Sequence, residues 1–484
     1  MRQYFFRELL CCVIMLGLAI AAFAQKQVIS PALSAVNDGD WDDRFGALGL
    51  NGPVHAIAAH DNKIYVGGYF SQAGNIAANN IAMWDGENWQ ALGAGISTIA
   101  VNAMVYAIAI TSNGDVFVAG QFSQAGEGEA ASIARWNGAS WSQLASGGRD
   151  GVNNTVYALA AIGNEVYACG LFSRAGDLTV NGMAKWDGAQ WTRLGTSSVN
   201  GVTGGAAYAL LAHDNELYAG GDFSRAGAIN ANRIAKWHPA RNEWTALDRG
   251  IDGPVYALAA NDSGEIFAGG AFSTASGIVV RNLAKWEGSA WSSLGAGADN
   301  GVSGPVRALA FKQPLLFVGG DFREAGSTAA NFIAKWNGSN WSPLGSGVSG
   351  IVYAFAYSGN GAIYVGGQFQ TAGGQPSHYF GIWREQTNAV ADNQNVLPGF
   401  ALHQNFPNPF NPATVIRFTL ARPQWVSLKI YDSQGREAAR LHEGLLMAGE
   451  HVISWQTHGF RSGVYLCQLT AGGFQETRKL LLVH

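Results

Sequence analysis

The stretch that decides the fold is VHAIAAHDNKIYVGGYFSQAGNIAANNIAMWDGENWQALGAG, at residues 54–95. Related stretches begin at residues 105, 156, 207, 255, 306 and 352, so seven copies follow one another at spacings of 51, 51, 51, 48, 51 and 46 residues. A fixed period of this length is typical of β-propellers and solenoids. The repeat therefore predicts how the chain is built, although it contains no pattern that identifies a catalytic reaction.

Each repeat contains four strand patterns. The first is an apolar run, such as residues 156–160 of the third repeat, and the second is a run such as residues 64–68 of the first repeat. Within a repeat the two are separated by a tight hairpin, such as Asp61-Asn62 in the first. The third and fourth, as in residues 333–336 and 341–345, flank pairs such as Asn337-Gly338, which favour hairpin turns because Asn and Gly tolerate positive φ. Four short antiparallel strands per repeat of roughly 50 residues are what one propeller blade needs.

The two ends of the repeat region predict a closed ring. The seventh repeat stops at Trp383 without a fourth strand, whereas WDDRFGALG at residues 41–49 resembles an orphan fourth strand that parallels residues 84–93 with one residue missing. An N-terminal strand that completes the last blade removes open sheet edges, while an open solenoid would need polar caps. We therefore expect an all-β, seven-bladed β-propeller over residues 39–384.

Composition excludes some partners. The chain has 484 residues with 64 Gly, only 13% charged residues and a net charge of −4. Nucleic-acid binding needs a concentrated basic patch, and a membrane-surface helix needs a basic amphipathic stretch; the sequence has neither. We expect no nucleic-acid partner.

The N-terminus has the pattern of a signal peptide at residues 1–24, followed by a lead segment at residues 25–38. Arg2 and Arg7 precede an apolar run, and Ala22-Phe23-Ala24 forms a cleavage site. A retained anchor is the alternative, although the run is short for a bilayer span. We expect no transmembrane segment after cleavage, and no disulfide between the two remaining cysteines, Cys169 and Cys467.

Several residue types recur at fixed places in the repeats. Phe and Trp residues present in every blade are expected to form the core between neighbouring sheets. The second glycine of each pair is expected at a bulge or at a positive-φ position. These glycines are Gly68, Gly120, Gly170, Gly221, Gly270, Gly320 and Gly367.

The second residue of the first strand is the first candidate for ligand binding. If this strand lines a central channel, its seven large, polar-tipped side chains would crowd one mouth, and Tyr and Arg are favoured binding anchors. Alternatively, the Tyr rings pack between blades with their hydroxyls at the rim. These residues are His55, Tyr106, Tyr157, Tyr208, Tyr256, Arg307 and Tyr353.

A second candidate position directly follows the glycine pair. It varies from blade to blade, which is typical either of a specific ligand surface or of an unconstrained solvent position. Asp222 and Asp321 occupy it in two blades. Neither lies in an oxygen-rich calcium loop, so we expect no metal and no cofactor. No HExxH, GxSxG or phosphate-loop motif is present, which favours a protein without catalytic activity but leaves the question open.

The repeats resemble bacterial β-propeller repeats of the kelch and galactose-oxidase-like kind. They are more similar to the GGxFxxAG…NIAxWDGxxWxxLG repeats of fungal cell-polarity cortical marker proteins, over about residues 39–384. The kelch pattern is incomplete: Gly67-Gly68 is present, but the usual Tyr between the glycines and the Trp is absent. The resemblance implies a propeller fold and a binding role.

After a polar linker at residues 385–402, the pattern changes. Residues 403–484 contain alternating runs at 414–420, 426–431, 451–455, 464–469 and 477–483. Five such runs, with one or two weaker strands, predict a small immunoglobulin-like β-sandwich.

This segment closely resembles the type A sorting domain of the type IX (Por) secretion system. Such domains begin with YPNPFNPxTxIxF, continue with LKIYDxxGRE and end with SGVYxxxL. The residues that match are Pro407, Asn408, Pro409, Phe410, Asn411, Pro412, Gly435, Arg436, Gly463 and Tyr465. The resemblance implies a Gram-negative bacterium, export by the type IX machinery and removal of the tail. An accessory sandwich with its own ligand is the alternative.

Together these features predict a secreted or outer-membrane surface protein. Its expected function is non-catalytic recognition of a glycan or a protein. The alternatives are a secreted polysaccharide lyase or glycosidase with its site at one propeller mouth, and a purely structural surface or adhesin component. A close pair of acidic residues facing the channel would favour the enzyme. Exposed Tyr and Trp at one mouth would favour recognition.

Overall fold

The computed structural model describes residues 41–99, 102–359, 361–384, 401–405, 407–420, 424–446, 449–457, 459–471 and 474–483. The expected signal peptide at 1–24, the lead segment at 25–38 and residues 385–400 of the expected linker lie outside this part. The chain divides into two compact units, residues 1–386 and 387–484, each of which is described by itself. None of the helices in the described part is long and apolar enough to cross a membrane.

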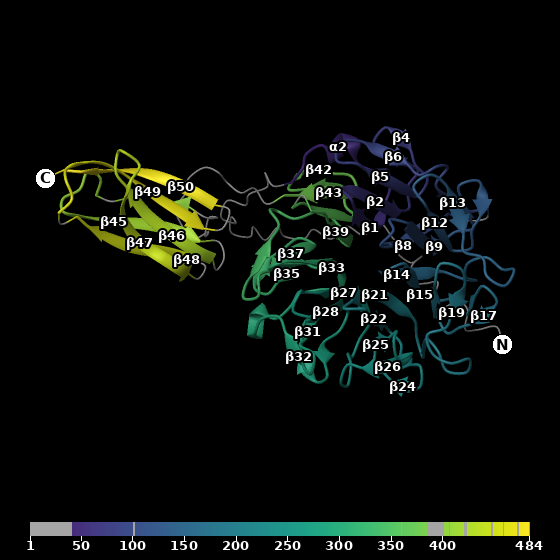
Figure 1. Ribbon diagram of the computed structural model, residues 1–484. Coiled ribbons are helices and arrows are strands. Elements are labelled where there is room, and N and C mark those ends of the chain that lie inside the picture. Colours follow the sequence, from purple (N-terminus) through teal and green to yellow (C-terminus); the bar gives the residue numbers. More distant parts are fainter. Residues whose placement is uncertain are drawn as a thin grey trace, which may run out of the picture. The chain divides into compact units, whose positions relative to one another are not determined.

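The first unit contains seven antiparallel sheets, one for each sequence repeat (Figure 1). Each of the first six sheets has four strands, which lie side by side in the order in which the chain makes them. The first sheet contains β1 (Val54–His60), β2 (Lys63–Gly68), β5 (Ile81–Trp84) and β6 (Trp89–Ala91); the second contains β8 (Met104–Ile110), β9 (Val116–Gln121), β12 (Ile133–Trp136) and β13 (Trp141–Gln143); and the third contains β14 (Val156–Ile162), β15 (Glu165–Gly170), β18 (Met183–Trp186) and β19 (Trp191–Thr192). The fourth contains β21 (Ala207–His213), β22 (Glu216–Gly221), β25 (Ile234–His238) and β26 (Glu243–Ala246); the fifth contains β27 (Val255–Ala260), β28 (Ile266–Gly270), β31 (Leu283–Trp286) and β32 (Trp291–Ser293); and the sixth contains β33 (Val306–Lys312), β34 (Leu315–Gly320), β37 (Ile333–Trp336) and β38 (Trp341–Pro343). The seventh has three: β39 (Ile351–Tyr357), β40 (Ile363–Gln368) and β43 (Phe380–Trp383).

The first strands of the seven sheets form the centre of a closed ring. Each of the strands β1, β8, β14, β21, β27, β33 and β39 contacts the next, and β39 contacts β1. Figure 1 shows these strands around the middle of the unit, with the outer strands radiating from them. The predicted seven-bladed propeller is therefore confirmed.

Each blade also has a short two-stranded ladder that the sequence pattern did not predict. The ladder lies between the second and third strands, where the chain turns back on itself. The pairs are β3 (Gln72–Ala73) with β4 (Ile76–Ala77), β10 (Gln124–Ala125) with β11 (Gly128–Glu129), β16 (Arg174–Ala175) with β17 (Leu178–Thr179), β23 (Arg225–Ala226) with β24 (Ile229–Asn230), β29 (Thr274–Ala275) with β30 (Ile278–Val279), β35 (Glu324–Ala325) with β36 (Thr328–Ala329), and β41 (Thr371–Ala372) with β42 (Gln375–Pro376). Two further short strands, β7 (Ile96–Ser97) and β20 (Val202–Thr203), join the ladders of the second and fourth blades.

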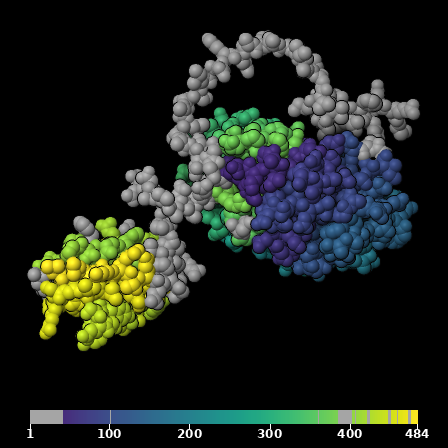
Figure 2. Space-filling view, turned by 90° about the horizontal axis from the view of Figure 1, so that it is seen from above, coloured from purple at the N-terminus to yellow at the C-terminus, as the bar shows by residue number. Residues whose placement is uncertain are grey.

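The two ends of the repeat region meet in the last blade. Trp41 forms an antiparallel bridge with Trp383, and the backbone N–H of Asp42 donates to the Ile382 carbonyl at 2.9 Å. The Asp42 carboxylate also pairs with Arg384 at 2.9 Å. In Figure 2, purple atoms from the start of the described chain lie against green atoms of the last blade. The ring is thus closed by residues more than 340 positions apart in the chain.

The form of this closure differs from the expected orphan strand. Trp41 pairs with Trp383 as Trp89 pairs with Trp84, so it takes the place of the second Trp of a pair, not the first. The fourth strand is reduced to this one bridge, because residues 45–48 form a short helix, α2 (Phe45–Leu48), whose Phe45 is fully buried. The alignment with residues 84–93 was therefore wrong in register.

Tryptophans connect each blade to the one before it. The indole N–H of the second Trp donates to a backbone carbonyl of the preceding blade at 2.6–3.4 Å; the pairs are Trp89 with Leu48, Trp141 with Leu92, Trp191 with Leu144, Trp244 with Leu194, Trp291 with Leu247 and Trp341 with Asp299. Trp41 makes the seventh such bond, to the Leu344 carbonyl at 3.2 Å. A buried indole N–H needs an acceptor, and here it finds one across the blade interface. The predicted interblade role of the tryptophans is confirmed.

The second unit is a sandwich of two antiparallel sheets. One contains β44 (Ala401–Leu402), β45 (Ala413–Leu420) and β48 (Gly449–Gln456); the other contains β47 (Glu437–Leu446), β46 (Gln424–Tyr431), β49 (Gly463–Ala471) and β50 (Phe474–Leu482). Phe418, Leu428 and Leu469 are fully buried between them. All five predicted strands are present, and β44 and β47 are the two weaker ones.

Candidate functional site

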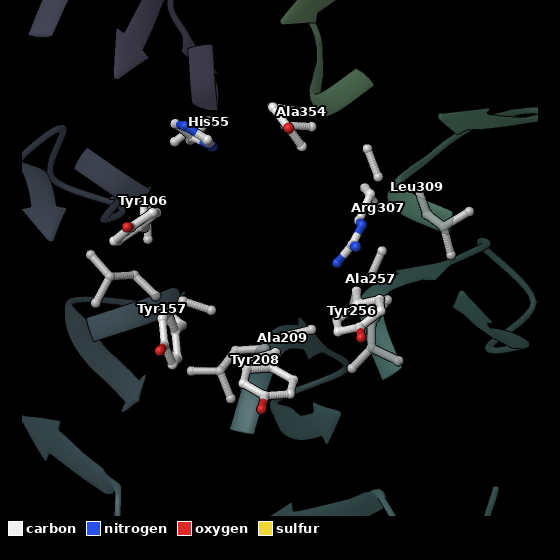
Figure 3. A pocket seen from close by; sticks show the side chains of 18 of the residues that line it. His55, Tyr106, Tyr157, Tyr208, Ala209, Tyr256, Ala257, Arg307, Leu309 and Ala354 are labelled. Atoms are coloured by element: carbon white, nitrogen blue, oxygen red, sulfur yellow. The ribbon is translucent and has the colours of Figure 1, made fainter. Parts of the chain in front are cut away.

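The seven residues of the first candidate position converge on one hollow at the centre of the propeller. The hollow has a volume of about 230 Å³, and small or aliphatic residues of the inner strands complete its wall. Figure 3 shows the labelled aromatic side chains around an open centre, with Arg307 extending into it from the wall. The residues that meet there are His55, Tyr106, Tyr157, Tyr208, Tyr256, Arg307 and Tyr353. We call these seven residues the ring.

A β-bulge in each inner strand aims the ring residue at the channel. In the first blade Val54 pairs with Gly68 and Ala56 pairs with Gly67, so that His55 is left without a partner in the ladder. The same irregularity recurs at the ring residue of all seven blades. Bulges re-aim side chains and are common beside functional sites. The bulge is the local reason that seven large side chains meet in one place.

The second glycine of each pair makes this bulge possible. A Cβ built on Gly68 would lie 2.0 Å from the Pro53 carbonyl oxygen, and the corresponding distance is 2.0–2.2 Å in the other six blades. None of these seven glycines has a positive φ. The predicted bulge is thus confirmed, while the positive-φ alternative is wrong. Glycine is required because two backbones approach closely, not because the turn is left-handed.

The ring residues touch their neighbours around the channel. The centroid of His55 lies 4.8 Å from that of Tyr353 and 5.6 Å from that of Tyr106. Further contacts join Tyr106 to Tyr157 at 6.0 Å, Tyr157 to Tyr208 at 5.5 Å and Tyr208 to Tyr256 at 5.8 Å. All seven side chains are half-buried. They therefore line the channel and also contact one another across neighbouring blades, so the geometry contains elements of both interpretations of this position.

Burial sets the protonation of the ring. Loss of solvent lowers the pKa of His55 to about 4, so its imidazole is neutral at pH 7. Loss of solvent also raises the pKa of Tyr208, and the carboxylate of Asp222, which accepts a hydrogen bond from the Tyr208 hydroxyl at 2.9 Å, raises it further. The Tyr208 hydroxyl is therefore a fixed donor. The ring presents neutral aromatic groups everywhere except at Arg307.

Arg307 is the single cation of the ring. Its guanidinium carbon lies 4.2 Å from the centroid of Tyr256, in a cation–π contact. Its Nε atom is buried and finds no hydrogen-bond acceptor among the described residues. An unsatisfied charged donor in a poorly solvated place is costly, so this position is suited to an acceptor brought by a ligand or by water.

The second candidate position lies beside the ring. Asp222 joins it through Tyr208, and its other carboxylate oxygen accepts from the Ala206 backbone N–H at 2.6 Å. Gln368 accepts a hydrogen bond from the Tyr353 hydroxyl at 3.2 Å. Asp321 is exposed. No group of three His, Cys, Asp or Glu residues that could hold a metal ion occurs in the described ranges.

The sequence pattern identified the ring residues and a bulge at the glycines, but not that this bulge aims the ring residues at the channel. The small residue that follows each ring residue, such as Ala56, Ala107 or Ala209, also lines the hollow and was not predicted. The repeated order of apolar residue, large residue and alanine was the available signal. Without the bulge, that order predicts ordinary alternation along a strand.

In the second unit, the predicted sorting-motif residues tie the first loop to the last strand. Asn408 accepts from the Leu481 backbone N–H at 2.8 Å, and Phe410 is buried and bridges Leu482 in parallel. Pro412 accepts a hydrogen bond from the Thr457 backbone N–H at 2.9 Å. The remaining members lie nearby in the chain: Pro407 and Asn411 in the same loop, and Pro409 beside the buried Phe410.

The other motif residues shape two turns of the sandwich. Gly435 has φ +76°, and Arg436, which follows it, pairs with the Asp432 carboxylate at 2.8 Å. Gly463 begins β49, and the Tyr465 hydroxyl donates to the Arg461 carbonyl at 2.9 Å. These residues hold the fold of the unit together, so the motif is at least partly structural.

Family models match both units. The Rax2 C-terminal beta propeller domain matches residues 138–303 and 206–346, and a beta-propeller domain of unknown function, DUF5122, matches residues 60–82. The secretion system C-terminal sorting domain matches residues 404–483. A match to kelch repeats is not among these findings, so the kelch-like repeat type stays a prediction. No curated protein matches the chain.

Solved structures share weak similarity with the chain. PorZ, a surface component of the type IX secretion system of Porphyromonas gingivalis, has 13% identity and a TM-score of 0.45 over 90% of this chain, which spans 60% of the length of PorZ. YCF48 bound to D1 peptide has 12% identity and a TM-score of 0.46, over 73% of this chain and 100% of that one. A structural-genomics protein of unknown function from Bacteroides thetaiotaomicron has 11% identity and a TM-score of 0.34, over 69% and 70% of the two chains. Scores in this range carry no argument about function.

The fold, the motif residues and the matched sorting domain agree on how the protein reaches its place of action. The chain is a β-propeller protein with a secretion system C-terminal sorting domain, delivered by type IX secretion to the surface or exterior of a Gram-negative bacterium.

Proposed function

We propose that the propeller is a non-catalytic recognition module that binds a glycan, or failing that a protein segment, at the mouth of its central channel. The observation that carries this proposal is the ring: seven large side chains from seven blades, each aimed by a bulge at the same hollow. Tyr and Arg are effective anchors because each combines contact area with hydrogen-bonding groups.

The size and lining of the hollow favour a sugar. Its volume of about 230 Å³ is below the ~300–1,000 Å³ of sites that enclose a whole small molecule. A hollow of this size suits one sugar ring, with the rest of a longer ligand lying on the surrounding rim. Tyr69 and Leu171, which belong to the second candidate position, are exposed large side chains available for that contact. Aromatic faces with hydroxyl groups match the alternating apolar and polar surfaces of a sugar.

The alternatives have less support. A lyase or glycosidase of the usual kind needs acidic groups aimed at the substrate, and a glycosidase needs two carboxylates ~5–9.5 Å apart. None of the described residues that line the hollow is Asp or Glu. A purely structural surface protein would have no need for a bulge that exposes a large side chain in every blade.

A glycan array tests this proposal with the purified full chain. The test variant combines Tyr106→Ala and Tyr157→Ala, which remove two neighbouring rings of the hollow. The matched control is Tyr357→Ala, because Tyr357 lies at the other end of the inner strand β39, is 44% exposed and does not line the hollow. We expect glycan binding that the control keeps and the double variant loses. Binding to no glycan, or equal binding by all three proteins, would contradict a glycan site in the channel.

A further inference from the structure

Arg307 differs from the other ring residues in a way that bears on what the hollow accepts. Five positions hold Tyr and one holds a histidine that is neutral at pH 7, so the fixed positive charge of the ring belongs to Arg307 alone. Its guanidinium is held against Tyr256 at 4.2 Å and extends into the open centre (Figure 3). The charge is thus positioned rather than free to follow solvent.

The guanidinium has donors to spare. Its Nε is buried without an acceptor, and no ion pair joins Arg307 to an acidic side chain in the described part of the chain. A guanidinium presents five N–H donors in a planar fork, whose geometry matches a carboxylate bidentately. The cation–π contact with Tyr256 also restrains the guanidinium, which lowers the entropy lost when a ligand binds.

Resting on the recognition role proposed above, we infer that the hollow selects sugars that carry a carboxylate, such as uronic acids, and that Arg307 is the residue that determines this specificity. The carboxylate accepts from the Arg307 fork, while the sugar ring lies against the neighbouring aromatic side chains. Loss of Arg307 should therefore remove the preference for acidic sugars and leave contact with neutral sugars in place.

The rim explains why a carboxylate fits better than a phosphate. Asp222 and Asp321 both lie at the second candidate position, and no lysine or second arginine lines the hollow among the described residues. One guanidinium balances one negative charge, but a phosphate monoester carries about −1.5 to −2 at pH 7 and would leave negative charge unbalanced near Asp222, whose carboxylate is bonded to Tyr208. A singly charged group is the anion that this charge distribution tolerates.

Asp321 is the acidic residue at the second candidate position of the blade that holds Arg307. It follows Gly320 in the same blade, just as Asp222 follows Gly221 in the blade of Tyr208. Asp222 reaches the Tyr208 hydroxyl at 2.9 Å, whereas the exposed Asp321 forms no ion pair with Arg307. Removing the Asp321 charge should consequently strengthen the binding of an acidic sugar, which gives the inference a test with a gain of affinity.

The experiment measures affinities of the full chain for matched pairs of ligands. The probes are oligosaccharides of galacturonate, alginate and hyaluronan, each beside its carboxyl-reduced, neutral counterpart. The variants are Arg307→Tyr, which installs the side chain used in most other blades, Arg307→Gln and Asp321→Asn. Denaturant midpoints establish that each variant is folded.

We expect the unchanged protein to bind at least one acidic probe tenfold or more tightly than its reduced form, as a charge-assisted bidentate pair permits. Both Arg307 variants should bring this ratio to within about twofold by lowering affinity for the acidic form alone. Asp321→Asn should raise it. Equal affinity for acidic and reduced probes, or a preference that survives in both Arg307 variants, would overturn the inference and leave the recognition role intact. A protein that binds no glycan at all would overturn the inference and the glycan site together. A ligand that proves to be a peptide carboxyl terminus held by Arg307 would overturn the inference but leave recognition of a protein segment in place.

Discussion

Replacing Trp41 by Ala tests whether the N-terminal segment closes the ring. Trp41 is 6% exposed, lies 5.3 Å from Trp383 in an edge-to-face contact and donates to the Leu344 carbonyl at 3.2 Å. Truncating a buried Trp to Ala typically costs about 3–5 kcal/mol of unfolding free energy. The lost hydrogen bond is included in that range, at about 1 kcal/mol. We therefore expect Trp41→Ala to lower the stability of the propeller by about 3–5 kcal/mol.

Denaturant unfolding followed by circular dichroism measures this loss. Trp41→Phe keeps an aromatic ring but has no N–H, so it should cost clearly less than the Ala variant. The matched control is Trp425→Ala in the second unit, because Trp425 is 62% exposed and should change stability by less than about 0.5 kcal/mol. A loss below about 1 kcal/mol for Trp41→Ala would refute the closure argument, because such a value is typical of a residue outside the packed ring.

Four further changes have expected outcomes. Gly221→Ala should lower stability by about 2 kcal/mol or more, because its Cβ would meet a carbonyl oxygen at 2.0 Å, whereas Gly359→Ala, with open space around it, should be near neutral in the same unfolding assay. Burial would raise the pKa of Asp42, but hydrogen bonds from two arginines outweigh it and hold the pKa at about 2. Stability from Asp42 is therefore present above its unfolded pKa of about 3.9 and lost as pH falls toward 2, so Asp42→Asn should flatten the pH dependence there by about 2 kcal/mol. NMR titration of His55 should give a pKa of about 4, and because the unfolded chain binds this proton more readily, stability should fall as pH drops from about 6.5 to 4, a slope that His55→Gln removes. Deleting residues 403–484 should leave a folded propeller in the periplasm, and its appearance in the medium would contradict the sorting role.

Much of the fold could be predicted because its rules are local. Apolar alternation marks a strand wherever it occurs, and Asp61-Asn62, whose φ values of 47° and 61° suit a tight hairpin, specifies the turn from two residues. The same reasoning found the five main strands of the sandwich. The short helix Phe45–Leu48 was missed because its residues resemble a strand end, and burial of Phe45 against Trp84 and Phe380 decides otherwise.

The candidate site could be predicted in part. A large residue recurring beside small ones pointed to the ring positions, and the variable position after the glycines was found by its variation. The bulge that unites them depends on Gly68 and its equivalents lying against the backbone of the adjacent strand, a contact between residues some fifteen positions apart. The loss of solvent at His55 and the isolation of the Arg307 charge arise only when seven blades surround them.

The sequence by itself determined the number of blades, the strands within each blade and the export route, because each of these depends on patterns within one repeat or one motif. The tertiary structure decided how Trp41 completes the last blade, which way the ring residues point, and that one uncompensated cation stands among neutral aromatic side chains. These features depend on which distant residues become neighbours when the ring closes, and no single repeat contains that information.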